Sequence, residues 1–419
     1  MTRQRENKQS KTGFWKRLGP GIITGASDDD PSGIATYTQA GARFGYSFLW
    51  VAILSFPLMV AVQEMCARIG LVTRKGLTRV IREHYSSTLH WLVLIVSVPA
   101  IVFNIGANLS AIGAVTQLLV PAIHPLFSIP LITALIGVAM IFYNYKRIAA
   151  VLKWLCLTLF CYLFIPFLSD PDWRAALWGS IAPSIEINLD SLLMFTALMG
   201  TTISPYLFFW QTSMEVEEHK GMRHARLDNE IRLMRGDVNL GMGLSNLIFY
   251  FIVLSAASTL YNSSAQGIGT VAEAAAALRP LAGESAYLFF ALGVIGTGLL
   301  SIPVLAGTLG YLLAESFGWK EGLNRKFHQA KGFYLSISLA LLVAMALPLT
   351  KIQPVKALVW SAVVYGLVAP VLIAVLLSIC NRKSIMGNHT NGALANIVGV
   401  ITLLIMGASA VMSLWLLGH

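Results

Sequence analysis

Long apolar stretches, each followed by a short charged or Gly/Pro-rich break, run through most of the chain and limit what it can fold into. A helix needs about 20 apolar residues to cross a bilayer. By this measure the sequence predicts eleven spans, at 18–41, 46–69, 91–120, 126–144, 148–168, 190–213, 238–260, 284–316, 333–350, 355–380 and 393–417. Only 12% of the 419 residues are charged, about half of the roughly 25% typical of soluble domains. We therefore expect an all-α polytopic membrane protein, which excludes a soluble enzyme and a disordered chain.

Lysine and arginine residues are distributed unevenly between the loops, and this predicts the orientation of the chain. With a cytoplasmic amino terminus, 25 of the 30 basic residues fall in cytoplasmic segments and 5 in the opposite set. The net charge of +10 is therefore a topology signal, and we expect no nucleic-acid partner. We expect residues 1–17 to be a basic cytoplasmic segment without a cleaved signal peptide. Residues 18–419 should form one transmembrane domain in the cytoplasmic (inner) membrane.

Two of the predicted spans contain a helix-breaking motif at matching positions. Residues 25–33 read Gly-Ala-Ser-Asp-Asp-Asp-Pro-Ser-Gly, and residues 200–206 read Gly-Thr-Thr-Ile-Ser-Pro-Tyr. Proline removes a backbone donor and clashes with the preceding turn, so spans one and six should break there. These spans begin two sets of five, about 18–168 and 190–380, which the odd number of spans makes inverted, and 393–417 is an extra helix. Paired interruptions in inverted repeats indicate the midplane site of a transporter.

Three consecutive acids, Asp28, Asp29 and Asp30, lie inside the first span. An aspartate at the centre of a membrane helix costs about 2.5–3.5 kcal/mol on insertion scales, so its presence beside a helix break favours a cation site. The alternative is that the acids lie at a membrane boundary and are solvated there. That alternative weighs more for Asp28 and Asp29, since three neighbours on a regular helix cannot share one face.

The ligand types at the two breaks narrow the choice of ion. Asp30, Thr201 and Ser204 offer carboxylate, hydroxyl and carbonyl oxygens, and Gly33 leaves room for water. Such hard oxygen ligands suit magnesium, calcium or manganese, whereas sulfur and nitrogen select softer metals. Magnesium keeps several of its waters when it binds. The alternative for Thr201 and Ser204 is that each hydroxyl bonds to the backbone of its own helix.

Several segments resemble the NRAMP family of divalent-metal transporters. The first-span run from Asp30 to Thr36, continuing through 41–50, is similar to the family's signature. The segments 67–73 and 82–85 look like its loop after span two, and 197–205 resembles its span-six motif. The resemblance is dense over the first 90 residues, returns near 190–215, and is weaker but collinear elsewhere. It implies a LeuT-type inverted-repeat fold with broken helices one and six, and transport by alternating access.

The departures from the family pattern bear on the substrate. The family's Asp-Pro-Gly-Asn reads Asp-Pro-Ser-Gly here, so that Gly33 replaces the asparagine. Ser204 stands at the position of a metal-binding methionine, and Tyr206 at that of a histidine. The span-three acids that serve as the family's proton route align with Asn108 and Ala111. This pattern looks like the NRAMP-related magnesium transporters of bacteria, which are described as lacking proton coupling.

We therefore expect a transporter, not an enzyme, that takes up Mg²⁺, and possibly Mn²⁺, by alternating access without proton coupling and without a cofactor. Its partners should be the metal ion and the lipid bilayer. Asp30, Gly33, Thr201 and Ser204 are the expected metal site. A second set, outside the first shell or on the ion pathway, comprises Asp28, Asp29, Tyr206 and Asn108. The alternatives are a proton-coupled manganese or iron transporter, in which Asp28 or Asp29 replaces the span-three acids, an amino-acid symporter of the same fold, and a membrane-embedded enzyme.

Overall fold

The apolar stretches fold into helices because a lipid-exposed backbone must satisfy its hydrogen bonds within the segment. The computed structural model describes residues 19–168, 171–184, 186, 188–220, 227–261, 271–350 and 353–417, so the basic segment 1–17 lies outside them. Large apolar side chains cover the outer faces; Phe127 and Leu131 of one outer helix are exposed. An apolar exterior of this kind is what a bilayer requires.

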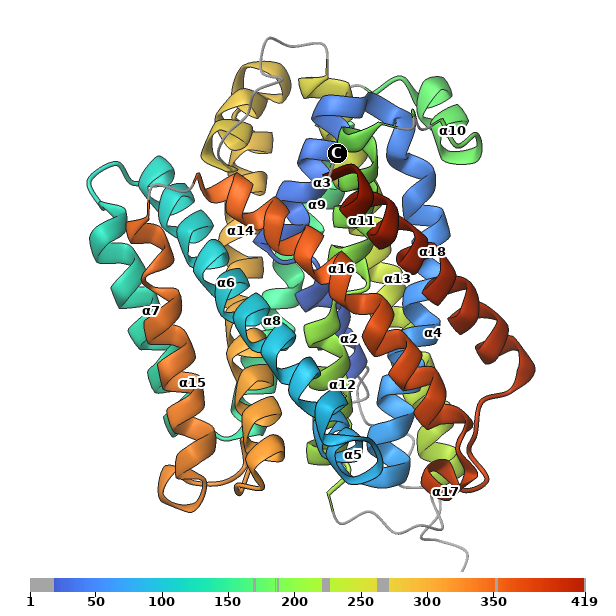
Figure 1. Cartoon of the computed structure of the whole chain (residues 1–419). Coiled ribbons are helices and arrows are strands. Elements are labelled where there is room, and N and C mark those ends of the chain that lie inside the picture. Colours follow the sequence, from blue (N-terminus) through green and yellow to red (C-terminus); the bar gives the residue numbers. More distant parts are fainter. Residues whose placement is uncertain are drawn as a thin grey trace, which may run out of the picture.

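The first half of the chain supplies five spans (Figure 1). The first is divided into two helices, and the fifth contains a 3-10 turn at Cys156–Leu159. Their bounds are α2 Pro20–Asp28 with α3 Pro31–Phe44, α4 Leu49–Thr73, α6 Ser87–Leu119, α7 Pro125–Phe142, and α8 Tyr145–Leu155 with α9 Phe160–Leu168.

The second half repeats this plan. Its first span is again divided, and its third bends at Gly283. The bounds are α11 Leu189–Thr202 with α12 Pro205–Glu218, α13 Leu227–Leu260, α14 Val271–Phe317, α15 Lys331–Ala344 and α16 Pro354–Asn381. The additional helix is α18 Ala393–Leu417, and short helices α5 Leu77–His84, α10 Trp173–Ile181 and α17 Lys383–Met386 lie between spans.

The prediction of eleven spans is confirmed by this order of helices. Ten segments of the described chain are long and apolar enough to cross a membrane, and the first of these, Pro31–Thr73, contains both α3 and α4. Gly45 separates the two: it adopts a φ of 59° and its N–H closes α3 on the Gly41 carbonyl. The predicted start of the seventh span, 238, is wrong, because α13 begins eleven residues earlier, at Leu227. Its charged first turns continue the helix beyond its apolar part.

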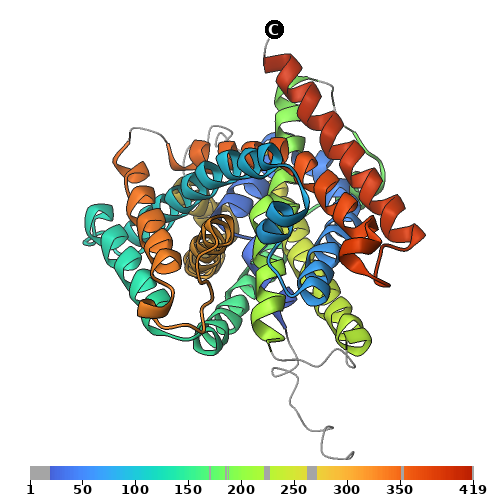
Figure 2. The same ribbon diagram turned by 60° about the horizontal axis from the view of Figure 1, so that its bottom comes forward.

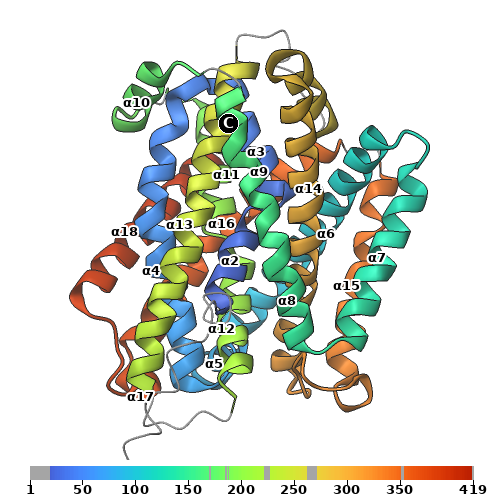
Figure 3. The same ribbon diagram turned by 180° about the vertical axis from the view of Figure 1, so that it is seen from behind.

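The divided spans lie in the middle of the bundle. The helix α13 runs along both α2 and α3, and α11 packs against α16 (Figures 1 and 3). In Figure 2, α14 is seen nearly along its axis, with α6 and α15 beside it. Both helix breaks are therefore enclosed by neighbouring helices, and the residues from Pro20 to Thr38 are all buried.

Candidate functional site

The first helix break lies between α2 and α3 at Asp29 and Asp30. Pro31 occupies the first position of α3, where its missing N–H is not needed. Asp30 is the N-cap: the Gly33 N–H donates to its Oδ1 at 2.8 Å. A carboxylate at this position also interacts favourably with the positive end of the helix. The local sequence thus fixes both the end of one helix and the position of a buried negative charge.

The other oxygen of Asp30 faces α6. Asn104 and Asn108 each donate a side-chain N–H to Oδ2 at 3.0 Å. The amide oxygen of Asn104 in turn accepts the hydroxyl hydrogen of Ser361 at 3.1 Å. The Asp30 side chain, with the residue 2% exposed, is therefore oriented by neutral amides from the third span.

The second helix break lies between α11 and α12 at Ile203 and Ser204, with Pro205 opening α12. The Ser204 hydroxyl donates to the carbonyl oxygens of Thr201 at 2.6 Å and Gly200 at 3.1 Å. For Ser204 the structure therefore shows the backbone bond named above as the alternative for its hydroxyl hydrogen. The lone pairs of Ser204 Oγ are not consumed by that donation, so the oxygen can still accept or ligate.

The two breaks meet at the centre of the bundle. The Tyr206 hydroxyl donates to the Ser27 carbonyl oxygen at 2.6 Å. A Cβ added to Gly33 would lie 3.2 Å from Thr201 Oγ1 and 3.1 Å from the Asp28 carbonyl oxygen. Asp30, Gly33, Thr201 and Ser204 thus follow one another across the junction, and the missing side chain of Gly33 leaves the space between its two sides.

Asp28 and Asp29 are also buried, at 1% and 0% exposure, which excludes the solvated boundary position for them. All three acids face the interior because the chain is not helical at the break. Ser245 of α13 donates to Asp28 Oδ2 at 3.3 Å. Within the described ranges, Asp28 Oδ1 and both oxygens of Asp29 accept no hydrogen bond, and no three His, Cys, Asp or Glu side chains form a metal-binding group.

Sequence reasoning assigned Asn108 to the surroundings of the site but did not assign Asn104, Ser361, Ser245 or Tyr37 to it. Their signal is a polar residue on an otherwise apolar helix, which also fits ordinary helix-to-helix hydrogen bonding. The contact of Asn104 with Asp30 spans 74 positions. Only the packing of α6 against the first break brings the two together.

Contacts on either side of the junction enclose it. On the side where α2 begins, Asp237 of α13 accepts from the N–H groups of Gly19 at 2.8 Å and Gly21 at 2.6 Å. Thr24 of α2 donates to Gln211 of α12. On the opposite side, Arg43 pairs with Asp190 at 2.7 Å. An ion leaving the junction on either side must pass these contacts.

His219 follows α12 on the side where α2 begins. Burial lowers its pKa, but a hydrogen bond and the attraction of Glu215 and Glu230 outweigh that effect, so that the pKa of His219 is raised. Two ring-nitrogen contacts, 3.3 Å to Glu215 and 3.5 Å to Glu230, become ion pairs when the ring is protonated. This end of α12 is thus tied to the start of α13 most strongly at lower pH.

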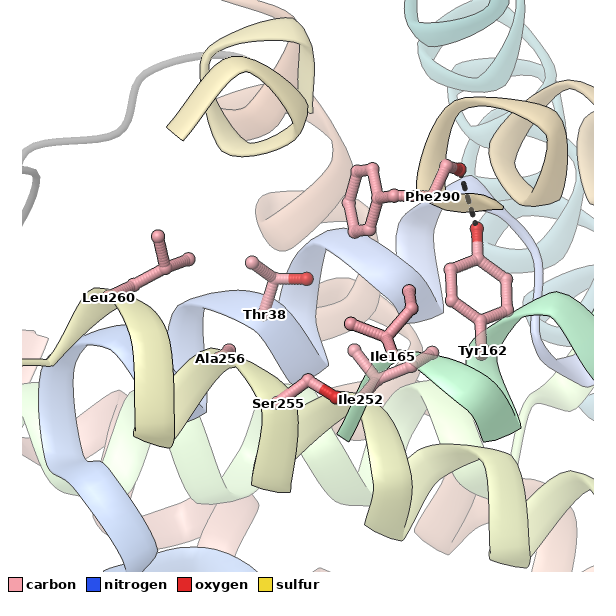
Figure 4. A pocket seen from close by; sticks show the side chains of 8 residues that line it. All are labelled: Thr38, Tyr162, Ile165, Ile252, Ser255, Ala256, Leu260 and Phe290. Carbon is pink, nitrogen blue, oxygen red and sulfur yellow. Dashed lines mark hydrogen bonds between the residues drawn. The ribbon is translucent and has the colours of Figure 1, made fainter. Parts of the chain in front are cut away.

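A small cavity of about 10 Å³ lies elsewhere, between α3, α9, α13 and α14 (Figure 4). Its lining is mostly apolar, and the Tyr162 hydroxyl donates to the Phe290 carbonyl oxygen at 3.3 Å. The lining residues are Thr38, Tyr162, Ile165, Ile252, Ser255, Ala256, Leu260 and Phe290. A space of this size holds about one water and is separate from the helix breaks.

Comparison with known families identifies the group to which the protein belongs. The model of the Nramp family, natural resistance-associated macrophage protein-like, matches residues 21–416. The chain belongs to the Nramp family. Members of this family are transporters rather than enzymes, so the resemblance seen in the sequence is confirmed and the membrane-enzyme alternative is excluded.

Individual relatives cover nearly the whole chain. The divalent metal cation transporter MntH of Granulibacter bethesdensis is 26% identical over 397 residues, which are 91% of this chain and 85% of the relative. The protein of the same name from Deinococcus radiodurans is 26% identical over 416 residues, or 96% and 90% of the two chains.

Solved structures share the fold. A point mutant of the Eremococcus coleocola manganese transporter superposes with a TM-score of 0.75 at 20% identity, covering 96% of this chain and 87% of that one. Mhp1, a nucleobase-cation-symport-1 family transporter, gives 0.61 at 14% identity with 95% and 92% coverage. The LeuT-type inverted-repeat fold with broken helices one and six is therefore confirmed for this Nramp protein.

Proposed function

We propose that this Nramp protein carries Mg²⁺ across the membrane at the junction of the two helix breaks, with Asp30 as the charged ligand. Thr201 and Ser204 contribute neutral oxygens, and Gly33 leaves space for water on the ion. The observation that carries this proposal is the setting of Asp30: a buried carboxylate, oriented by two neutral amides, at the point where both breaks meet. Partial hydration suits magnesium, which dehydrates reluctantly.

The preference for magnesium rests on ligand type. Ser204 and Tyr206 provide hydroxyl groups at the second break, at positions where the family pattern has a thioether and an imidazole. Hard oxygen ligands give no advantage to softer transition metals over alkaline earths. Mn²⁺ accepts the same ligands, so we expect it to be carried as well.

The absence of proton coupling is the second part of the proposal. The groups on α6 that contact Asp30 are the amides of Asn104 and Asn108, which do not titrate. A membrane potential of 100 mV, negative inside, favours entry of a divalent cation by about 4.6 kcal/mol, twice the value for one charge. Uptake therefore needs no proton gradient. For the same direction of uptake, we place the protein in the cytoplasmic membrane with its amino terminus inside.

Relatives named divalent metal cation transporter MntH, and a structural neighbour named as a manganese transporter, support the class of substrate. They also favour the second candidate, a proton-coupled manganese transporter. In that case a group other than Asn104 and Asn108 would have to carry the proton, and Asp28 or Asp29 is the nearest candidate.

Flux into proteoliposomes separates the two candidates. We expect the wild type to admit Mg²⁺ when a negative-inside potential is applied, with no acidification of the interior. Asp30→Asn should lower the flux about 10-fold or more, because it removes the charged ligand. Asp228→Asn makes the same chemical change at an exposed position and should leave the flux unchanged. Entry of Mn²⁺ with protons, and no entry of Mg²⁺, would refute the magnesium proposal.

A further inference from the structure

Two buried carboxylates beside the Asp30 site are not balanced by any neighbour that the structure describes. Asp29 is 0% exposed, and in the described chain neither of its oxygens accepts a hydrogen bond. Asp28 is 1% exposed and accepts one weak bond, from Ser245 at 3.3 Å. Charged groups that act on both side chains are other carboxylates, so nearby charge adds to the cost of burial. A buried charge is retained in proteins when it is paired or binds a cation.

These two acids do not belong to the ligand set around Asp30. The carboxylate of Asp30 is directed to α6 and to the Gly33 N–H, whereas Asp28 contacts Ser245 on α13. In keeping with this divergence, the described residues contain no group of three acidic or other metal-binding side chains. An ion held by Asp30 therefore leaves Asp28 and Asp29 without a ligand of their own.

A further polar group points to a ligand on the α13 side of the break. The hydroxyl of Tyr37 is fully buried and, among the residues that the structure describes, has no hydrogen-bond partner. Asp29 is the charged group that acts on it most strongly. The Tyr37 ring is fixed by stacking on Phe249 of α13, with ring centroids 4.3 Å apart. The carboxylates and two hydroxyls, from Tyr37 and Ser245, thus form a set of hard oxygen atoms.

We propose that Asp28 and Asp29, together with Ser245 and Tyr37, form a second cation site, which takes a monovalent alkali ion such as sodium. The choice of charge rests on the proposed function. Three carboxylates carry three negative charges, and one divalent ion at Asp30 neutralises two of them. One monovalent ion balances the remainder, whereas a second divalent ion would leave a buried excess of positive charge. Oxygen-only ligands suit a hard ion of this kind.

Binding of ²²Na⁺ to the purified full-length protein in nanodiscs tests the site directly. We expect the wild type to bind ²²Na⁺ both with and without saturating Mg²⁺. Asp29→Asn should weaken ²²Na⁺ binding about 10-fold or more, because it removes a charged ligand. Asp30→Asn should keep ²²Na⁺ binding while it loses Mg²⁺. Asp228→Asn, exposed and remote, should bind both ions like the wild type.

Tyr37→Phe guards against a folding defect in the aspartate variant. The change removes a hydroxyl that has no hydrogen-bond partner in the described structure, so the fold should be retained. We expect about a 3-fold loss of ²²Na⁺ affinity with Mg²⁺ affinity unchanged, because one neutral ligand is removed.

Three results would overturn the second site. They are no ²²Na⁺ binding by the wild type, equal binding by wild type and Asp29→Asn, and two Mg²⁺ ions per chain with ²²Na⁺ fully displaced. Failure of the proposed function gives a different pattern: Mg²⁺ would not bind the wild type, while ²²Na⁺ binding would still depend on Asp29.

Discussion

The two helix breaks occupy equivalent places in the repeats but differ in chemistry. Each has proline at the first position of the following helix, Pro31 in α3 and Pro205 in α12. The first break carries three buried carboxylates, whereas the second carries none between Thr201 and Tyr206. One repeat therefore supplies the charge and the other supplies neutral oxygens. The inverted repeat preserves the geometry of the break and leaves its chemistry free to differ.

The capping of the two helices shows the same division. Asp30 accepts the Gly33 N–H and so satisfies the start of α3 with a charged group. Ser204 directs its hydroxyl hydrogen backwards to α11, and its side chain makes no capping bond to α12 within the described residues. The first break is thus locked into the helix that follows it, and the second into the helix that precedes it.

The largest expected effect concerns what the breaks share. Gly25 in α2 and Gly200 in α11 each lie shortly before a break and against the backbone of a neighbouring helix. A Cβ at Gly25 would overlap the Gly241 carbonyl of α13, and one at Gly200 would overlap the Ala362 carbonyl of α16. We expect Gly25→Ala and Gly200→Ala each to lower the free energy of unfolding by about 1–3 kcal/mol, as overpacking does. Thermal unfolding of the purified protein measures this.

Gly236→Ala is the matched control for both variants. Among the described atoms, none lies within 4 Å of the Cβ that this change would add. It should be neutral or stabilise the helix by up to about 1 kcal/mol. Equal melting temperatures for the three variants would show that close approach of the backbones is not required at either break.

The next effect separates the two breaks. A Cβ on Gly33 would lie 3.1 Å from the Asp28 carbonyl oxygen and 3.2 Å from Thr201 Oγ1, in the space proposed for the ion and its water. We expect Gly33→Ala to weaken Mg²⁺ binding about 10-fold, equivalent to about 1.4 kcal/mol. Ser204→Ala in the second break should cost only about 3-fold, because one neutral ligand is lost. Calorimetric titration measures both.

The two affinities must differ in that order. If Ser204→Ala weakened binding more than Gly33→Ala, the second break would be the dominant half of the site. The assignment of charge and space to the first break would then be wrong.

The helix breaks were predictable from sequence because proline acts locally. Pro31 and Pro205 stop a helix wherever it is packed, so the pairs α2/α3 and α11/α12 follow from the motif alone. The orientation of the acids was not predictable in this way. A regular helix would have spread Asp28, Asp29 and Asp30 over different faces, and only the non-helical backbone at the break turns all three inward. The α6 amide Asn104 was missed because its contact depends on helix packing across the repeat.

The smallest expected effect concerns the bond that joins the breaks. The Tyr206 hydroxyl donates at 2.6 Å to the carbonyl oxygen of Ser27, in the last turn of α2, where helical carbonyls have no partner within the helix. Tyr206→Phe leaves that buried carbonyl without this donor and should lower the free energy of unfolding by about 1 kcal/mol, with Mg²⁺ affinity nearly unchanged. Tyr143→Phe, at an exposed position, is the control. A large loss of Mg²⁺ affinity in Tyr206→Phe, without a change in stability, would instead make the Tyr206 oxygen a ligand and give the second break a larger share of the site.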